Sequence, residues 1–246
     1  MESLPPIVVS FASQGRENYN AGLLRLAKSL KAHWSGYIKL YSFDGYVDEY
    51  AGVPIELCGG AQVPQPSKFI CSHHSQIPYQ FKFGIIQKMR EQGYKKILWL
   101  DSAMVMERDC VDLFERASNG IIAFHNLGHD LYKYISDTAI HNLNQSESTI
   151  KEIKQTWGGA IGFDFENEIA CAVFDEIVRQ SQIGSFNDGN SVRDGFVAHR
   201  HDQAVMSVLF ARNNVELLPY GTIVTHPHYL PPYEYGESFF ISHRPI

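Results

Sequence analysis

Asp101 is the first residue whose position suggests chemistry, because it follows directly on the apolar run Lys96–Leu100 (KILWL). An apolar run of this kind is typical of a buried strand, and open α/β sheets bind ligands beyond the carboxyl ends of their strands. We therefore expect Asp101 to contact a ligand. The alternative is ordinary turn chemistry, since an Asp-Ser pair also begins turns.

A second polar group is His199–Gln203 (HRHDQ), which leads into an apolar helical pattern. Two imidazoles and a guanidinium here stand close in sequence to the carboxylate of Asp202. Such groups change one another's proton affinity and are common where phosphate is bound or protons move. Plainer roles stay open: Asp202 can cap the helix, Arg200 can be a solvated charge, and each histidine can serve packing or capping.

Paired glycines and alternating histidines give weaker signals. Trp157 precedes Gly158 and Gly159, which let a backbone approach a ligand closely and can equally make a tight turn. An indole also stacks well on the face of a sugar. His226 and His228 alternate, so in an extended segment both point to one side, as a pair of metal ligands would. Their alternative role is hydrogen bonding to the backbone.

The composition is that of a globular protein and argues against several classes. Of 246 residues, 44% are hydrophobic and 20% charged, and the net charge of -6 counts against nucleic-acid binding. The four cysteines form no CxxC pair, so we expect reduced, structural thiols. The sequence lacks the pattern of a signal peptide and the long apolar run of a membrane span, which predicts a cytoplasmic protein without a transmembrane segment. P-loop, GxGxxG and GxSxG motifs are absent, which counts against nucleotide triphosphatases, dinucleotide oxidoreductases and serine hydrolases.

Strands and helices must position these residues, and the hydrophobic periodicity predicts them in alternation. We expect strands at 7–12, 37–41, 96–100, 121–124, 160–165 and 215–218, and helices at 23–34, 79–92, 169–182 and 202–212. Residues 53–76 are rich in Pro and Gly and are predicted to form a long surface loop. The alternation predicts an α/β fold with a parallel sheet and crossover helices.

The segment Pro78–Glu115 resembles part of the GT-A-type nucleotide-sugar glycosyltransferases, in which a helix leads into a strand that ends in a DxD motif. The Asp202-Gln203 pair at a helix start resembles the corresponding segment of the family-8-like members. The resemblance implies a single GT-A-like (Rossmann-like) domain over residues 1–246, with a mostly parallel central sheet flanked by helices. Residues 1–115 would be the nucleotide-binding half, and residues 116–246 the donor-sugar and acceptor half. In that family the DxD carboxylates hold Mn²⁺ or Mg²⁺ against the donor diphosphate, whose charge must be stabilised as it leaves.

The motif is degenerate in this chain, where it reads Asp101-Ser102-Ala103. Ala103 offers no oxygen ligand, so we expect a divalent ion to bind more weakly than in the family, or not at all. The resemblance makes Asp202 and Gln203 the catalytic residues, near the anomeric carbon. It implies donor contacts by Ser13, Arg16, Lys82, Asp101, Ser102, Gly158, Gly159 and His201, and metal ligation, where a metal binds, by Asp101 with His226.

The resemblance predicts a hexosyl- or pentosyltransferase. Its donor would be a nucleoside-diphosphate sugar, and its acceptor a glycan, an oligosaccharide or another hydroxyl compound. The alternative is a non-catalytic nucleotide-sugar or glycan-binding protein of the same fold, which the loss of the second carboxylate at Ala103 favours.

Overall fold

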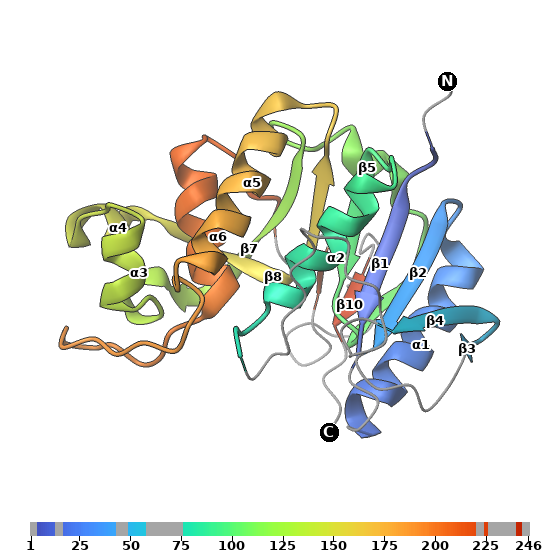
Figure 1. The fold of residues 1–246 in the computed structure, drawn as a ribbon, viewed down its shortest axis with the longest axis horizontal. Coiled ribbons are helices and arrows are strands. Elements are labelled where there is room, and N and C mark those ends of the chain that lie inside the picture. The colour runs from blue at the N-terminus through green and yellow to red at the C-terminus, as the bar shows by residue number, and fades with distance from the viewer. Residues whose placement is uncertain are drawn as a thin grey trace.

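The computed structural model describes residues 4–12, 17–42, 49–57, 76–219, 224–225 and 240–242. In these residues the chain forms one α/β domain around a seven-stranded sheet of order β3-β4-β2-β1-β5-β8-β7 (Figure 1). Its strands are β1 (Ile7–Phe11), β2 (Tyr37–Ser42), β3 (Glu49–Tyr50), β4 (Val53–Leu57), β5 (Lys96–Leu100), β7 (Ile121–Asp130) and β8 (Lys154–Asp164). A smaller sheet combines β6 (Met104–Met106), β9 (Val224–Thr225) and β10 (Phe240–Ser242).

The centre of the large sheet is parallel, as predicted. Strands β4, β2, β1 and β5 run side by side in one direction, whereas β3, at one edge, and β8 are antiparallel to their neighbours. Strand β8 lies along β5, with Trp99 opposite Ile161 and Leu100 opposite Ala160. The carboxyl end of β5 therefore meets the first half of β8, which carries the glycine pair.

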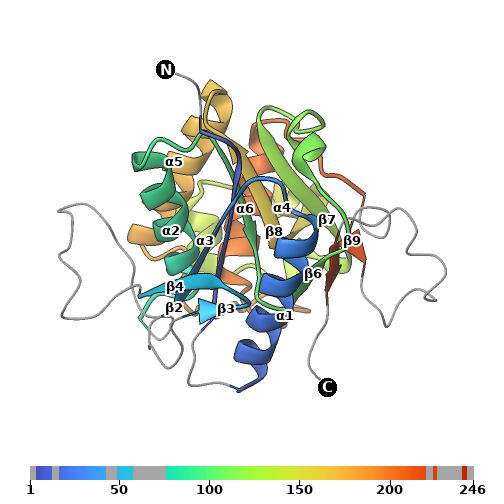
Figure 2. The same ribbon diagram turned by 90° about the vertical axis from the view of Figure 1, so that its right-hand side faces the viewer.

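Helices cover both faces of the sheet (Figure 2). Helix α1 (Glu17–His33) packs on one face, while α2 (Gln80–Glu91), α5 (Glu168–Gln182) and α6 (His201–Arg212) pack on the other. Alternate residues of each strand point to opposite faces, so the inner strands are apolar on both sides. The short 3-10 helices η1 (Val111–Phe114) and η2 (Leu131–Lys133) flank β7.

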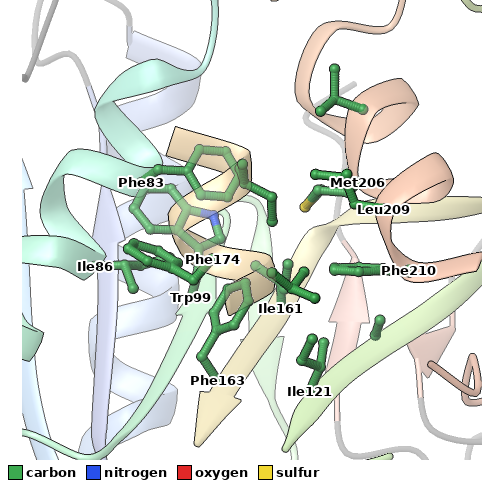
Figure 3. Packing of buried hydrophobic residues seen from close by; sticks show 14 of the residues in the cluster. Phe83, Ile86, Trp99, Ile121, Ile161, Phe163, Phe174, Met206, Leu209 and Phe210 are labelled. Atoms are coloured by element: carbon green, nitrogen blue, oxygen red, sulfur yellow. The ribbon is translucent and has the colours of Figure 1, made fainter. Parts of the chain in front are cut away.

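Aromatic side chains fill the layer beneath α2, α5 and α6 (Figure 3). The rings of Phe163 and Phe174 meet edge to face at 5.2 Å, and the ring of Phe83 lies 6.3 Å from that of Phe174. Trp99 and Ile161, which oppose each other in β5 and β8, belong to the same buried cluster. Burial of one such side chain contributes roughly 1.5–3 kcal/mol. This layer therefore holds α2 and α6 firmly against the end of β5.

Two of the expected elements were wrong. Residues Val53–Leu57, predicted as the start of a loop, form β4, because β2 supplies backbone partners that local periodicity does not show. Residues 215–218, predicted as a strand, form a single bridge between Leu218 and Phe124. The amide of Val215 bonds back to the carbonyl of Phe210, so this segment first closes helix α6.

Two short helices were not expected. Helix α3 (Asp137–Asn142) follows Ser136, whose hydroxyl accepts a hydrogen bond from the Ala139 amide, and α4 (Glu147–Glu152) follows Ser146 in the same way. Serine caps of this kind satisfy free amides at helix starts and are a signal that the sequence carries.

Candidate active site

Asp101 lies at the end of β5, beside β8. Its amide donates a hydrogen bond to the carbonyl of Gly159, at 2.8 Å, which continues the pairing of the two strands. Its Oδ1 accepts a hydrogen bond from the indole Nε1 of Trp99, at 2.7 Å. The Asp101 side chain is 42% exposed. One carboxylate oxygen is thus fixed by the protein, while the group remains open to a ligand from solvent.

Lys82 joins this strand end to helix α6. Its Nζ donates to Oδ2 of Asp202 at 2.8 Å and to the carbonyl of Gly158 at 2.7 Å, and it lies 3.8 Å from Oδ1 of Asp101. The side chains of Lys82 and Asp202 are each 1% exposed. Segments of α2, β5, β8 and α6 therefore meet at one buried ammonium group.

Aromatic rings complete the surroundings of Lys82. Its Nζ lies 5.5 Å from the ring centre of Trp99 and 5.5 Å from that of Tyr79. Burial by itself lowers the pKa of a lysine, but Asp202 and Asp101 outweigh it and hold the pKa of Lys82 above its ordinary value. Lys82 therefore stays charged, and its ammonium group interacts within the protein with two carboxylates and a carbonyl.

Partial burial raises the pKa of the Asp101 carboxyl above its ordinary value, and Lys82 and the Trp99 N–H act against that rise. Water limits the rise, because 42% of the side chain is open. The open side of this group presents the carboxyl group of Asp101, whereas Lys82 and Asp202 lie behind it. The open side of this group thus suits hydroxyl donors or cations.

Gly158 and Gly159 are required by close packing. A β-carbon at Gly158 would lie 2.7 Å from Cγ of Gln203, and one at Gly159 would lie 2.3 Å from the indole of Trp157. The first glycine thus lets α6 approach β8, and the second makes room for the indole. Within the described part of the chain, the Oε1 atom of Gln203 is buried without a hydrogen-bond partner. That oxygen is a buried acceptor beside the Lys82 cluster.

Ser102 and His201 lie at the margins of the cluster. Ser102 is 5% exposed, and its carbonyl would lie 2.6 Å from a β-carbon at Gly22, so α1 packs directly on its backbone. His201 is 19% exposed and donates from Nδ1 to the carbonyl of Phe186 at 2.8 Å. Its ring lies 5.6 Å from that of Tyr79.

The remaining predicted site residues, Ser13, Arg16 and His226, lie outside the described residues. The structure therefore brings together Asp101, Lys82, Asp202, Gly158 and Gln203, with Gly159 supporting them through Trp157 and the Asp101 amide.

His199 belongs to the support of the site. Its Nδ1 accepts a hydrogen bond from the Ser136 amide at 3.1 Å, so its Nε2 carries the proton and donates to the carbonyl of Ser185 at 2.9 Å. Burial lowers the pKa of His199 to about 4. The neutral imidazole thus fastens the segment before α6 to the start of α3.

Trp99 and Tyr79 were missed by the sequence reasoning. Trp99 stands two positions before Asp101, and the two-residue period of a strand puts both side chains on one face, which is a usable signal. Tyr79 precedes helix α2 in a left-handed backbone conformation, with φ of 60°. The residues around Tyr79 in the sequence do not predict that conformation.

The described residues fit a divalent metal poorly. Among them, no group of three or more His, Cys, Asp or Glu side chains could hold an ion. Asp101 is the one open carboxylate of the described cluster, because Oδ2 of Asp202 is bonded to Lys82 and position 103 is an alanine. Hard divalent ions bind best to several oxygen ligands. The predicted metal partner, His226, lies outside the described residues.

In the described ranges, none of the helices has both the length and the apolar character that crossing a bilayer requires. The described cysteines, Cys110 and Cys171, are free thiols, as predicted for them.

Comparison with known proteins identifies a shared fold. No protein-family model and no curated protein sequence matches this chain. Among solved structures, the apo form of the WbbM bifunctional glycosyltransferase is similar, with a TM-score of 0.59 and 14% sequence identity over 100% of this chain. The chain spans 46% of the length of that protein. The likeness shows that the two chains share an α/β fold.

Proposed function

We propose that this chain is a glycosyltransferase that moves a hexose or pentose from a nucleoside-diphosphate donor to a hydroxyl of a glycan or oligosaccharide. The observation that carries the proposal is the cluster of Asp101, Lys82 and Asp202. It unites the strand end and the helix start that, by the family resemblance, would hold the donor and the reacting sugar. Its position beyond the carboxyl end of a central strand is where α/β sheets bind ligands.

In this proposal Asp101 accepts hydrogen bonds from hydroxyls of the donor, since its carboxylate is the exposed one. Lys82 donates to Asp202 and orients its carboxylate, and both side chains lie behind the open carboxylate of Asp101. From that position the Asp202 carboxylate would stabilise positive charge that develops at the anomeric carbon. Gln203, whose Oε1 is buried without a partner among the described residues, remains a candidate contact for a sugar hydroxyl.

The shared fold with WbbM supports this proposal, because that protein is a bifunctional glycosyltransferase. A divalent ion at Asp101 would supply charge stabilisation for the departing diphosphate. The described residues provide one carboxylate for it, so the proposal assigns no step to a metal. His201, Ser102, Gly158 and Gly159 remain donor contacts, and Ser13, Arg16 and His226 remain candidates in the same proposal.

A second candidate function is a binding protein for nucleotide sugars or glycans that performs no transfer. Ala103 favours it, because a chain that lost the second DxD carboxylate lost a group that acts on the leaving diphosphate. The buried Lys82–Asp202 pair is compatible with both functions.

The test is to mix the protein with a panel of nucleoside-diphosphate hexoses and pentoses, each with Mn²⁺, with Mg²⁺ and with EDTA. Melting temperature and free nucleotide are measured, with and without oligosaccharide acceptors. We expect one donor to raise the melting temperature and to release nucleotide when an acceptor is present. Stabilisation without release would favour the binding protein. No shift with any donor would overturn the transferase, and no shift with any donor or any oligosaccharide would overturn both functions.

Asp101→Asn provides the site control, since it keeps the shape of the side chain and removes its charge. We expect it to abolish the donor-induced shift. Asp175→Asn is the matched variant. Asp175 lies in α5, is 64% exposed and pairs with Arg90 in the last turn of α2. The donor-induced shift of the Asp175→Asn protein should equal that of the wild type.

A further inference from the structure

Tyr79 holds an unusual backbone conformation beside the candidate site. Its φ of 60° and ψ of 2° place it in the left-handed region, immediately before helix α2. Among the described residues, the other non-glycine residues with positive φ are Ala51, Asn119, Asn144, His201 and Asn214. Asparagine tolerates this region, whereas a bulky aromatic residue pays a steric cost there. A conformation of this kind persists only where its surroundings enforce it.

The residues that follow Tyr79 in the chain enforce its left-handed backbone conformation. Gln80, 3% exposed, donates from its amide to the hydroxyl of Ser181 at 3.2 Å. The ring of Phe81 lies 4.4 Å from that of Phe11 and 6.0 Å from that of Trp99. With these two residues fixed in the core, the backbone at Tyr79 turns so that its own ring lies near Lys82.

The ring of Tyr79 is part of the cover of the ion pair. Its centre lies 5.5 Å from Nζ of Lys82 and 5.6 Å from the ring centre of His201. The ring of Trp99 also lies 5.5 Å from Nζ of Lys82. An ammonium beside aromatic rings is stabilised by the negative ring faces and is shielded from water. His201 is itself a left-handed residue, with φ of 35°, and it begins helix α6. Strained residues thus stand at the starts of both helices that supply the pair.

We propose that Tyr79 is a positioning residue, whose ring, held in the left-handed conformation, keeps water from the Lys82–Asp202 pair and fixes the carboxylate of Asp202. The proposal deepens the proposed function, because it rests on Asp202 facing the reacting sugar. Burial, Asp202 and Asp101 raise the pKa of Tyr79 to about 12, so its hydroxyl stays neutral and adds no charge beside the Lys82–Asp202 pair.

The first test measures the reactivity of Lys82 and needs no sugar. The protein is treated with an amine-acetylating reagent, and mass spectrometry follows the acetylation of each lysine. Tyr79→Asn keeps a residue that tolerates the left-handed region and removes the ring, and Tyr79→Phe keeps the ring. We expect Tyr79→Asn to raise the labelling rate of Lys82 about tenfold or more, and Tyr79→Phe to leave Lys82 protected.

Two references make this measurement decisive. Lys28 is exposed and should be labelled at one rate in every variant. Ala51→Gly relieves a left-handed residue in the turn between β3 and β4, so it should leave Lys82 protected. Should Tyr79→Asn fail to fold, Tyr79→Gly removes the ring with the least backbone strain. Protection of Lys82 in a folded ring-free variant would overturn the proposal.

The second test uses turnover of the donor found for the wild type. We expect Tyr79→Asn to lower kcat about tenfold or more while changing KM about threefold or less, since Asp202 acts on the reacting sugar. Wild-type kcat in the ring-free variant would overturn the proposal. If the wild type turns over no donor, the proposed function fails, and the labelling of Lys82 still decides whether Tyr79 shields the pair.

Discussion

The ammonium of Lys82 donates to the carboxylate of Asp202 across 2.8 Å, although the two residues are 120 positions apart in the sequence. Both side chains are 1% exposed. Desolvation of two charges is costly, and a buried pair of this kind is stable only while both partners and their other hydrogen bonds are present. The carbonyl of Gly158 and the open carboxylate of Asp101 provide those further partners.

Removal of the lysine charge should therefore destabilise the fold strongly. We expect Lys82→Met to lower the free energy of unfolding by about 3–5 kcal/mol, because Asp202 would remain buried without its partner. The double variant Lys82→Met/Asp202→Leu should recover a large part of that loss. Urea unfolding measures both values.

The matched control for this prediction is Lys88→Met, which removes a half-buried lysine from a pair with Glu56 at 3.2 Å. Its loss should be about 1 kcal/mol or less, since accessible ion pairs contribute little. Equal losses in Lys82→Met and Lys88→Met would contradict the view of Lys82 as the centre of the site.

Gly159→Ala should be destabilising because of the indole of Trp157, which lies 2.3 Å from the place of the new β-carbon. We expect a loss of about 1–3 kcal/mol, the usual cost of an overpacked contact. In the Trp157→Ala background the same change should cost much less, because the clash is removed. A double-mutant cycle by thermal or urea unfolding measures this coupling, and additive losses would show that the two residues do not touch.

His199 should make stability fall with acidification. Its pKa is about 4 in the folded protein and 6.5 in an unperturbed histidine, so the unfolded chain binds its proton first as the pH falls. Stability is lost between about pH 7 and about pH 4, and it amounts to about 3 kcal/mol over that window. His199→Gln can accept from Ser136 and donate to Ser185 without titrating.

Urea unfolding of wild type and His199→Gln at several pH values checks this prediction. The difference between their unfolding free energies should shrink or change sign as the pH falls. A difference in unfolding free energy that stays constant from pH 7 to pH 4 would show that folding leaves the proton affinity of His199 unchanged. That result would be incompatible with a neutral, buried His199.

Gln203→Met should separate stability from ligand binding. The change removes an Oε1 that is buried without a partner in the described structure, so the free energy of unfolding should stay equal or rise by about 1 kcal/mol. The donor-induced shift in melting temperature should decrease, because the sugar loses an acceptor. A variant that is clearly less stable would show that this oxygen is satisfied in solution, and unchanged donor binding would remove Gln203 from the site.

Several parts of the site could be inferred from local sequence. The apolar strand before Asp101 and the helical pattern after Asp202 placed both carboxylates at the ends of elements, and both lie there. Trp99 was within reach of the same reasoning, since it shares a strand face with Asp101. The position of β4 and the bridge at Leu218 were not predictable in this way, because each depends on a partner strand.

The kind of fold and the residue types at its strand ends could be inferred from local sequence, since hydrophobic periodicity and helix starts are local properties of the chain. The position of the Lys82 ammonium inside the protein, between Asp202 and the Gly158 carbonyl, follows from tertiary packing. The reason is physical: whether a cation faces a ligand or a buried carboxylate depends on how α2 and α6 pack across β5 and β8. That packing is set by contacts between residues far apart in the chain.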